Sequence, residues 1–358
     1  MKPAALRHVI AALVASAGLL GAQAALSQAA PAAAPAAASS SSQALTPARI
    51  QAALDDALKT YQNTTGGKNA DYIPALAKVD SKIYGIALVT PDGKVYTAGD
   101  VKSQVSIQSI SKVFTMARVI EDMGPKAILD RIGVDATGMR FNSIVSVEVA
   151  QKELGGPEIN PLVNPGAITA TSMVAGKTRA EVWKRILDYH SDFAGRALTV
   201  DKPVFDSEAA TNQRNQAIGA LMYAYGFIKD NPAQAVDVYT EQCAISVNAR
   251  DLAIMAGTLA NAGKNPVTGK QVMKPANVPG VLAVMATAGL YDDSGKWLYR
   301  TGLPAKSGVG GGIIAVSPGK FGIAVVSPPL DEAGNSVKAQ LAIERISNAL
   351  GANPYAPK

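Results

Sequence analysis

Two predicted β-hairpins, one near each end of the chain, are the feature that most limits how this sequence can fold. Each has two runs of β-forming residues on either side of a Pro/Gly turn, at Pro91-Asp92-Gly93 and at Pro318-Gly319. The four runs are residues 82–90, 94–98, 312–316 and 321–326. Residues 107 to about 262, between the hairpins, have a mainly helical pattern broken by Gly, Pro and Asn. Since hairpins build antiparallel sheet and helices cover it, we expect an α+β fold whose sheet joins both chain ends and carries a helical insertion.

Helices are also predicted outside the two hairpins. Thr46-Pro47 is typical of a helix start, because an N-cap residue is followed by proline at the first helical position, and it opens an amphipathic helix over residues 46–60. Residues 336–350 predict a final helix. The sequence has no internal repeat.

The first residues are typical of a secretory signal peptide. Lys2 and Arg7 give a positive start, residues 9–20 are apolar but short for a membrane span, and Ala22-Gln23-Ala24 matches an A-x-A cleavage site. We therefore expect residues 1–24 to be removed and the mature chain to be periplasmic or secreted. The alternative is a short membrane anchor.

A low-complexity stretch follows the predicted signal peptide. Residues 25–44 consist mainly of Ala, Pro and Ser without periodicity, which predicts a flexible linker. The folded domain should then occupy residues 45–358. No later stretch reaches 18 uninterrupted apolar residues, so we expect no further membrane span. A hydrophobic content of 48% and a charged content of 17% supply enough material for a core.

Composition excludes several kinds of site. Removal of Lys2 and Arg7 leaves 32 basic against 28 acidic residues, a scattered charge of +4 that gives nucleic-acid binding little support. His8 leaves with the signal, so His190 is the only histidine left, and a His-rich metal site is impossible. We interpret His190, near the end of a helical run, as a structural residue whose positive charge suits the helix dipole. Cys243, the only cysteine, is interpreted as a small core residue.

The strongest chemical signal is a serine and a lysine three residues apart at a predicted helix start. Ser109 opens a helix that runs to about Met123, and Lys112 lies on the same face, flanked by apolar residues. Desolvation would lower the pKa of Lys112 and so make it a base for the serine hydroxyl. The backbone N–H of a serine at a helix start can also stabilise an oxyanion.

An S-x-x-K pattern is common by chance, and a second copy at 317–320 falls in a hairpin turn. The first copy gains weight from Lys306-Ser307-Gly308, because S-x-x-K with a downstream K-[ST]-G on a strand is the pattern of penicillin-recognising serine enzymes. Glycines at 308 and 310–312 allow close backbone approach to a substrate. A phosphate-binding loop is the competing interpretation, but no G-x-x-x-x-G-K-[ST] is present.

Several longer segments make the chain resemble the serine-dependent glutaminase family of the bacterial glutaminase A type, over about residues 46–355. The segments are QSISK (108–112), NPLVNPGAI (160–168), SE (207–208) with RN (214–215), CAISVN (243–248), MATAGLY (285–291) and GLPAKSGVGGG (302–312). The resemblance implies a β-lactamase-like fold, hydrolysis of L-glutamine to L-glutamate and ammonia, no metal or cofactor, and a homo-oligomer, either a dimer or a tetramer.

The resemblance also implies roles for particular residues. Ser109 would be the nucleophile, Lys112 its base and Tyr291 a proton relay, with Lys306 in support and the N–H groups of Ser109 and Val309 as the oxyanion hole. The residues expected to hold the amino-acid end of glutamine are Tyr72, Asn164, Glu208, Asn215 and Tyr239. One departure is Pro165, which stands where the family pattern has a small residue and which lacks an N–H.

Each of these residues has a structural alternative. Glu208 could be a helix-start charge, Asn164 and Asn215 turn or cap residues, Tyr239 and Tyr291 core aromatics, Lys306 a solvated strand-end charge, and Tyr72 merely the residue before Ile73-Pro74. Two other functions also remain open. A β-lactamase or peptidase of the same fold would acylate on penicillin, and a non-catalytic binder of amino acids would bind glutamine without releasing ammonia.

Overall fold

The computed structural model describes residues 44–153, 155–156 and 159–356. The predicted signal peptide, residues 1–24, and all of the predicted linker but its last residue lie outside this part of the chain. The first helix, α1 (Pro47–Tyr61), begins where the sequence predicts, because the Thr46 side chain accepts a hydrogen bond from the Arg49 N–H. No helix in the described ranges is long and apolar enough to cross a membrane.

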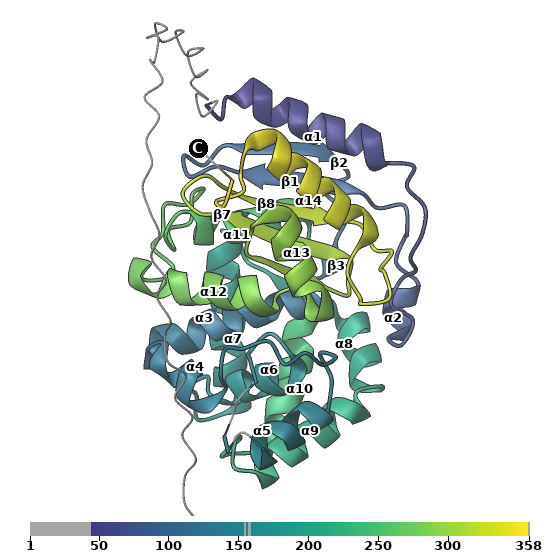
Figure 1. Cartoon of the computed structure of the whole chain (residues 1–358). Coiled ribbons are helices and arrows are strands. Elements are labelled where there is room, and N and C mark those ends of the chain that lie inside the picture. The colour runs from purple at the N-terminus through teal and green to yellow at the C-terminus, as the bar shows by residue number, and fades with distance from the viewer. Residues whose placement is uncertain (1–43, 154, 157–158, 357–358) are drawn as a thin grey trace, which may run out of the picture. The chain divides into compact units, whose positions relative to one another are not determined.

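The main sheet has five antiparallel strands in the order β2-β1-β8-β7-β6 (Figure 1). Both predicted hairpins are confirmed, as β1 (Gly85–Val89) with β2 (Val95–Gly99) and as β7 (Gly312–Ser317) with β8 (Phe321–Val326). Strand β1 pairs with β8, with Ile86 opposite Val325, so the sheet does join the two ends of the chain. The fifth strand, β6 (Ala305–Gly308), pairs with β7 at the edge.

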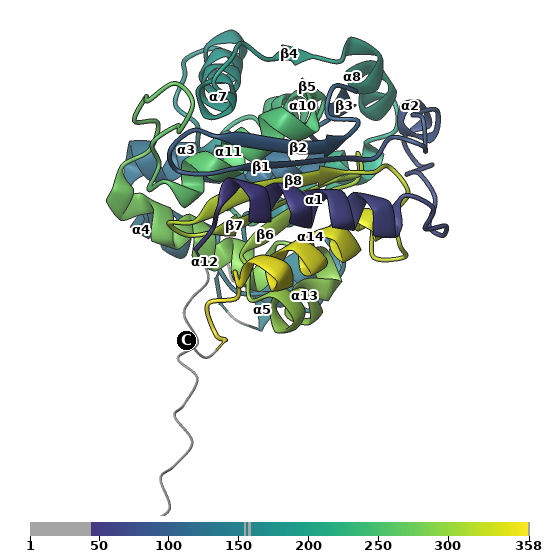
Figure 2. The ribbon, with the colours of Figure 1, turned by 90° about the horizontal axis from the view of Figure 1, so that it is seen from above.

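Alternating side chains along the strands divide the core between the two faces of the sheet. Ile86 and Leu88 point toward α1 and α14 (Val337–Leu350), whereas Ala87 and Val89 belong to the core that contains α11 (Ala249–Ala260). Figure 2 shows α1 and α14 on one side of the strands and α11 on the other.

The helical insertion packs beyond α11 and carries most of the middle of the chain. Its helices are α3 (Ser111–Met123), α4 (Lys126–Arg131), α5 (Val145–Lys152), α6 (Asn164–Ser172), α7 (Arg179–Ala194), α8 (Lys202–Ala209), α9 (Gln213–Ala224) and α10 (Pro232–Cys243). Smaller helices flank it, namely α2 (Pro74–Ala77), α12 (Val278–Ala288) and α13 (Ser294–Thr301), with 3-10 turns η1 (Gln108–Ile110), η2 (Pro275–Asn277) and η3 (Tyr291–Asp293). The α+β architecture predicted from the sequence is therefore confirmed.

A second, three-stranded sheet inside the insertion was not predicted. Its order is β3-β5-β4, with β3 (Val105–Ser106), β5 (Ile245–Val247) and β4 (Thr199–Val200). Strands of two or three residues leave almost no periodic pattern in a sequence. This sheet is important for the site, because β3 leads directly into η1 and the residues around Ser109.

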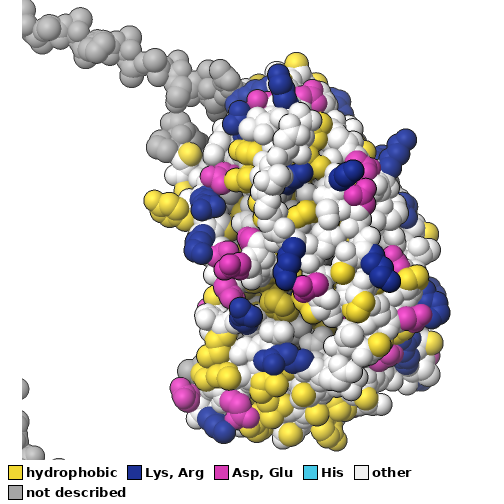
Figure 3. Space-filling view, turned by 90° about the vertical axis from the view of Figure 1, so that its right-hand side faces the viewer, with side chains coloured by type: hydrophobic (Ala, Val, Ile, Leu, Met, Phe, Trp, Pro, Cys, Tyr) yellow, Lys and Arg dark blue, Asp and Glu magenta, His cyan; other side chains and the backbone are white. Residues whose placement is uncertain are grey.

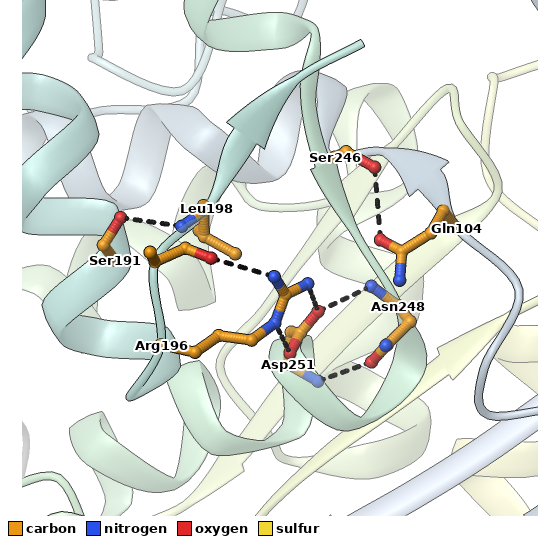
Figure 4. Close-up of polar contacts among 8 residues, drawn as sticks. Gln104, Ser191, Arg196, Leu198, Ser246, Asn248 and Asp251 are labelled. Atoms are coloured by element: carbon orange, nitrogen blue, oxygen red, sulfur yellow. Dashed lines mark hydrogen bonds and ion pairs between the residues drawn. The ribbon is translucent and has the colours of Figure 1, made fainter.

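Polar contacts fix the small sheet to α11 (Figure 4). Asn248 and Asp251 form a reciprocal capping box at the start of α11. Arg196 donates from Nε to Asp251 Oδ1 at 2.7 Å, and the Asp251 side chain is only 4% exposed. Gln104, just before β3, accepts a hydrogen bond from Ser246 in β5.

Candidate active site

Ser109 lies in the tight turn between β3 and α3. Gln108, the residue before it, has a left-handed backbone with φ of 48°, which is uncommon for a residue other than glycine. This bend places Ser109 in the short helix η1, and α3 starts two residues later than the sequence predicts. Ser109 remains 6% exposed, whereas the neighbouring Ile110 is fully buried.

Lys112 is buried and lies against Ser109. Its Nζ donates a hydrogen bond to Ser109 Oγ, and its side chain is 1% exposed. Burial lowers the pKa of Lys112 to about 8, although Cys243 and Glu208 nearby act in the opposite direction. A lysine with a lowered pKa in contact with a serine hydroxyl can act as that hydroxyl's base.

Strand β6 brings Lys306-Ser307-Gly308 to the same place. A Cβ added at Gly308 would lie 2.8 Å from the Ile107 carbonyl oxygen and 3.3 Å from the Ser109 nitrogen, so only glycine lets this strand pass so close. Lys306 is fully buried, and its Nζ donates to the carbonyl oxygens of Gly289 at 2.9 Å and Ser307 at 2.6 Å. Burial holds the pKa of Lys306 well below its usual value. The interpretation of Lys306 as a solvated charge is therefore wrong.

Tyr291 joins this group from the segment between α12 and α13. The Lys306 Nζ lies 4.1 Å from the centre of the Tyr291 ring, and the Tyr291 hydroxyl donates to the Ser307 carbonyl oxygen at 3.4 Å. Burial raises the pKa of Tyr291, and contacts with Ser109 and Ser307 act against this rise. Tyr291 is 7% exposed and contacts chemically active groups, which favours a role beyond core packing.

A small hollow of about 90 Å³ opens beside Ser109. It is lined by Val309 and by every residue to which the family resemblance assigns the amino-acid end of the substrate: Tyr72, Asn164, Glu208, Asn215 and Tyr239. Asn164 Nδ2 donates to Asn215 Oδ1 at 2.9 Å, and the Tyr239 hydroxyl donates to Asn164 Oδ1 at 3.1 Å. Tyr72 lies at the rim, because its side chain is 54% exposed.

Glu208 supplies the carboxyl group of this hollow. Burial raises its pKa to about 7, and a hydrogen bond from Gln108 and the charge of Lys112 limit the rise. The Gln108 Nε2 donates to Glu208 Oε2 at 3.2 Å. Glu208 lies near the end of α8 rather than at its start, so the interpretation as a helix-start charge is wrong.

Pro165 does not disturb Asn164. Asn164 and Pro165 are the first two residues of α6, where a missing N–H leaves no helical hydrogen bond unmade. The Asn164 N–H donates to the Phe141 carbonyl oxygen at 2.7 Å, while its side chain is held by Asn215 and Tyr239. Hydrogen bonds thus fix both the backbone and the side chain of Asn164.

Comparison with known proteins connects this geometry to a family. Residues 67–355 match the Glutaminase family. A glutaminase of Colwellia psychrerythraea is 52% identical over 306 residues, which cover 86% of this chain and 97% of that protein. The chain belongs to the glutaminase family. It is accordingly an enzyme of the amidohydrolase class, EC 3.5.1.2.

Solved structures of glutaminases have the same fold. The probable glutaminase ybaS is 45% identical, with a TM-score of 0.85, over 87% of this chain and 100% of that one. A probable glutaminase from Bacillus subtilis, solved in complex with 6-diazo-5-oxo-L-norleucine, is 29% identical, with a TM-score of 0.75, over 86% of this chain and 96% of that one. These matches confirm the β-lactamase-like fold expected of a glutaminase.

Several residues of this glutaminase line the hollow without having been predicted. Gln108, Phe141 and Asn142 are the clearest, and Arg214, quoted only as part of a motif, donates from Nε to the Asn142 carbonyl oxygen at 2.8 Å. Phe141 packs against Tyr291 with ring centres 4.8 Å apart and the rings tilted by 41°. Phe141 and Asn142 lie in an irregular segment without periodicity, so no sequence signal identifies them. Gln108 could have been predicted to line the site, because it directly precedes the candidate nucleophile Ser109 in the sequence.

A wider hollow of about 290 Å³ adjoins the first one. The two share Tyr72, Phe141, Asn142 and Val309 in their walls, so they lie side by side. Figure 3 shows acidic and basic side chains interspersed over the face on the right of Figure 1.

The single histidine and the single cysteine of the predicted mature chain are both buried. The ring nitrogens of His190 lie 2.8 Å from the Ile186 carbonyl oxygen and 3.2 Å from that of Ser111, and burial lowers the pKa of His190 to about 4. His190 is therefore structural, as expected, but its predicted positive charge is wrong. Burial raises the pKa of the Cys243 thiol to about 12, which suits a core residue.

Proposed function

We propose that this glutaminase hydrolyses L-glutamine to L-glutamate and ammonia with Ser109 as nucleophile and Lys112 as base. The observation that carries the proposal is the contact between the buried Lys112 Nζ and the Ser109 hydroxyl. No other described lysine contacts a serine hydroxyl in this way, and the histidine lies elsewhere in the core.

The first half of the reaction forms a glutamyl ester. Neutral Lys112 takes the proton from Ser109 Oγ as the oxygen attacks the side-chain amide carbon of glutamine. The N–H groups of Ser109 and Val309 stabilise the negative charge that develops on the amide oxygen. The proton reaches the amide nitrogen through Tyr291, the carbon–nitrogen bond breaks, and ammonia leaves.

The second half releases glutamate. A water molecule gives a proton to Lys112 and attacks the ester carbon, and the bond to Ser109 Oγ breaks as that oxygen takes the proton back. Ser109 and Lys112 return to their initial states, so water and glutamine are the only reactants. The residues in named roles require neither metal nor cofactor.

The small hollow suits the amino-acid end of glutamine. Glu208 can pair with the substrate ammonium, while Asn164, Asn215 and the Tyr phenols supply neutral polar groups for the carboxylate. The related Bacillus subtilis protein was solved with 6-diazo-5-oxo-L-norleucine, a compound that is itself an amino acid. This supports a site built around free amino-acid groups.

We expect Glu208→Gln to lower kcat/KM for glutamine by about one to two orders of magnitude. The change keeps the shape of the side chain but removes a charge-assisted contact, worth roughly 1.5–3 kcal/mol. Simple amides without an amino group never use this contact and serve as the internal control. Steady-state ammonia release from both substrates, with wild type and variant, measures the difference.

Equal losses on the two substrates would mean that Glu208 is structural and that the ammonium pocket lies elsewhere. A pH series adds a second criterion. Because Glu208 has a pKa of about 7, the unoccupied site loses its negative charge as pH falls below 7, and glutamine binding should weaken there. The variant should lack this dependence.

One assay separates the proposed function from its two rivals. The purified mature chain is given glutamine, asparagine and a chromogenic lactam, and ammonia release or lactam opening is followed. We expect rapid release from glutamine and no acylation by the lactam. Binding of glutamine without ammonia release would favour a non-catalytic binder, and lactam opening would favour a β-lactamase or peptidase.

We also propose that the chain is exported to the periplasm or outside the cell and functions as a homo-oligomer. Cleavage is expected after Ala24 or a few residues later. Mass spectrometry of the N-terminus from fractionated cells checks this, and full-length protein in the cytosol would contradict it. Sedimentation of the purified chain gives the number of subunits.

A further inference from the structure

Gln108, which precedes the proposed nucleophile, and Tyr291, the proposed proton relay, share an unusual backbone conformation. In the described part of the chain, three residues other than glycine have positive φ, namely Gln108 at 48°, Tyr291 at 53° and Ala262 at 52°. A tyrosine in the left-handed region is strained, because its Cβ lies too close to the following carbonyl oxygen. Such a conformation persists only where the surroundings hold it.

A serine hydroxyl holds each of the two strained residues at the site. Ser111 Oγ donates to the Gln108 carbonyl oxygen at 2.7 Å, and Ser294 Oγ donates to the Tyr291 carbonyl oxygen at 2.8 Å. In both cases the serine lies three residues after the strained residue and begins a helix, α3 or α13. The same local device thus occurs on both sides of the site.

Ser294 holds its turn from two sides. Its hydroxyl also accepts a hydrogen bond from the Leu290 N–H at 3.0 Å, so it binds the Gly289–Leu290 peptide as well as the Tyr291 carbonyl, one on each side of the strained residue. The Ser294 side chain is buried and 5% exposed, which keeps water from competing for either bond.

The direction of the Tyr291 side chain depends on this turn. With φ in the left-handed region, the ring points at Lys306 and the hydroxyl reaches the Ser307 carbonyl oxygen beside Ser109. Relaxation of φ to negative values would swing the Cβ, and the phenol with it, away from β6. Lys306 Nζ donates to the Gly289 carbonyl oxygen of the Gly289–Leu290 peptide, from whose N–H Ser294 accepts, but it makes no hydrogen bond to the Tyr291 carbonyl oxygen, which Ser294 holds.

We propose that Ser294 is a positioning residue for Tyr291, whose left-handed turn it holds so that the phenol stays beside Ser109. The proposal rests on the proposed function, in which Tyr291 relays the proton to the leaving nitrogen. Ser294 itself touches no reacting atom.

The test is a double-mutant cycle of Ser294→Ala and Tyr291→Phe, with kcat and KM measured on glutamine. We expect Ser294→Ala to lower kcat about tenfold, because a misplaced catalytic group costs up to roughly a hundredfold. KM should change less than twofold, since Asn164, Glu208 and Asn215 are untouched. In the Tyr291→Phe background, Ser294→Ala should cause no further loss, because the hydroxyl it positions is already gone.

Ser191→Ala is the matched control. The Ser191 hydroxyl also accepts from one backbone N–H, that of Leu198 at 3.1 Å, and donates to one carbonyl, that of Leu187 at 2.8 Å, but it holds no strained residue. We expect this variant to keep the wild-type kcat. Ser294→Thr retains the hydroxyl and should recover most of the activity that Ser294→Ala loses.

Two results would overturn the positioning role. One is an equal loss of kcat from Ser294→Ala in the wild-type and Tyr291→Phe backgrounds, which would indicate a general structural effect. The other is an unchanged kcat in Ser294→Ala while Tyr291→Phe is impaired. Full activity in Tyr291→Phe would instead contradict the proposed role of Tyr291, which separates that failure from a failure of the Ser294 inference.

Discussion

Ser109→Ala is expected to abolish turnover of glutamine, with a loss of at least about 10⁴-fold in kcat. The substitution removes the only atom proposed to form the covalent ester. It should leave the fold intact, because Ser109 Oγ has Lys112 as its hydrogen-bond partner and carries no structural contact to the backbone. Ammonia release and a thermal melting curve on the same preparation measure both effects.

The second S-x-x-K copy provides the control. Ser317 has the same spacing to a lysine, at Lys320, but Ser317 ends strand β7 and Lys320 lies in the turn that leads to β8. We expect Ser317→Ala to keep wild-type activity. If Ser109→Ala kept most of the activity with a native melting curve, Ser109 would have no place in the mechanism.

Lys112→Met is expected to lower kcat by about 10²–10⁴-fold, the usual contribution of a general base. Methionine has a similar length and suits the apolar surroundings, so the loss measures the amine rather than the packing. Lys320→Met, in the second S-x-x-K copy, should have no such effect.

The role of Lys112 as a base also predicts how the rate of glutamine hydrolysis changes with pH. A base must be neutral, and the pKa of Lys112 is about 8, so the wild-type rate should rise with pH up to about 8 and then level off. The Glu208 carboxyl contributes a separate step near pH 7, which Glu208→Gln removes. A rise near pH 8 that persisted in Lys112→Met would mean that another group is the base.

Lys112→Met should lower activity without lowering the stability of the fold. Because burial lowers the pKa of Lys112 below its unfolded value, the buried amine costs folding free energy, in full below about pH 8 and progressively less as pH rises toward the unfolded pKa of 10.5. Lys112→Met removes this cost, so its melting temperature at pH 7 should be equal to or higher than that of wild type. Functional residues are often retained at such a cost to stability.

The parts of the fold that were predictable are those with local signals. The two hairpins follow from Pro/Gly turns between β-forming runs, and Thr46 marks the start of α1 through an ordinary N-cap bond. The three-stranded sheet was missed because its strands are two or three residues long and pair between segments far apart in sequence. Tertiary pairing, rather than local pattern, decides such short strands.

The site residues also divide into those that local sequence signals predict and those that they do not. Ser109 and Lys112 could be derived from spacing, because both lie within one helical turn. Asn164, Asn215 and Tyr239 come from three different helices, so only the resemblance to glutaminases brought them together before the structure did. The positive φ of Gln108 and Tyr291 had no signal at all, since nothing in either residue type favours that conformation.

The pairing of β1 with β8 also determines when this enzyme can become active during its synthesis. β8 begins more than 230 residues after β1 ends, so at about 5–20 residues per second the ribosome needs roughly ten to fifty seconds to supply the partner strand. Until then, β1 has an open edge, and Ser109 lacks both Lys306 and Val309. A nascent chain therefore carries its nucleophile early but cannot complete the pocket around it until the segment from β6 to β8 has been made.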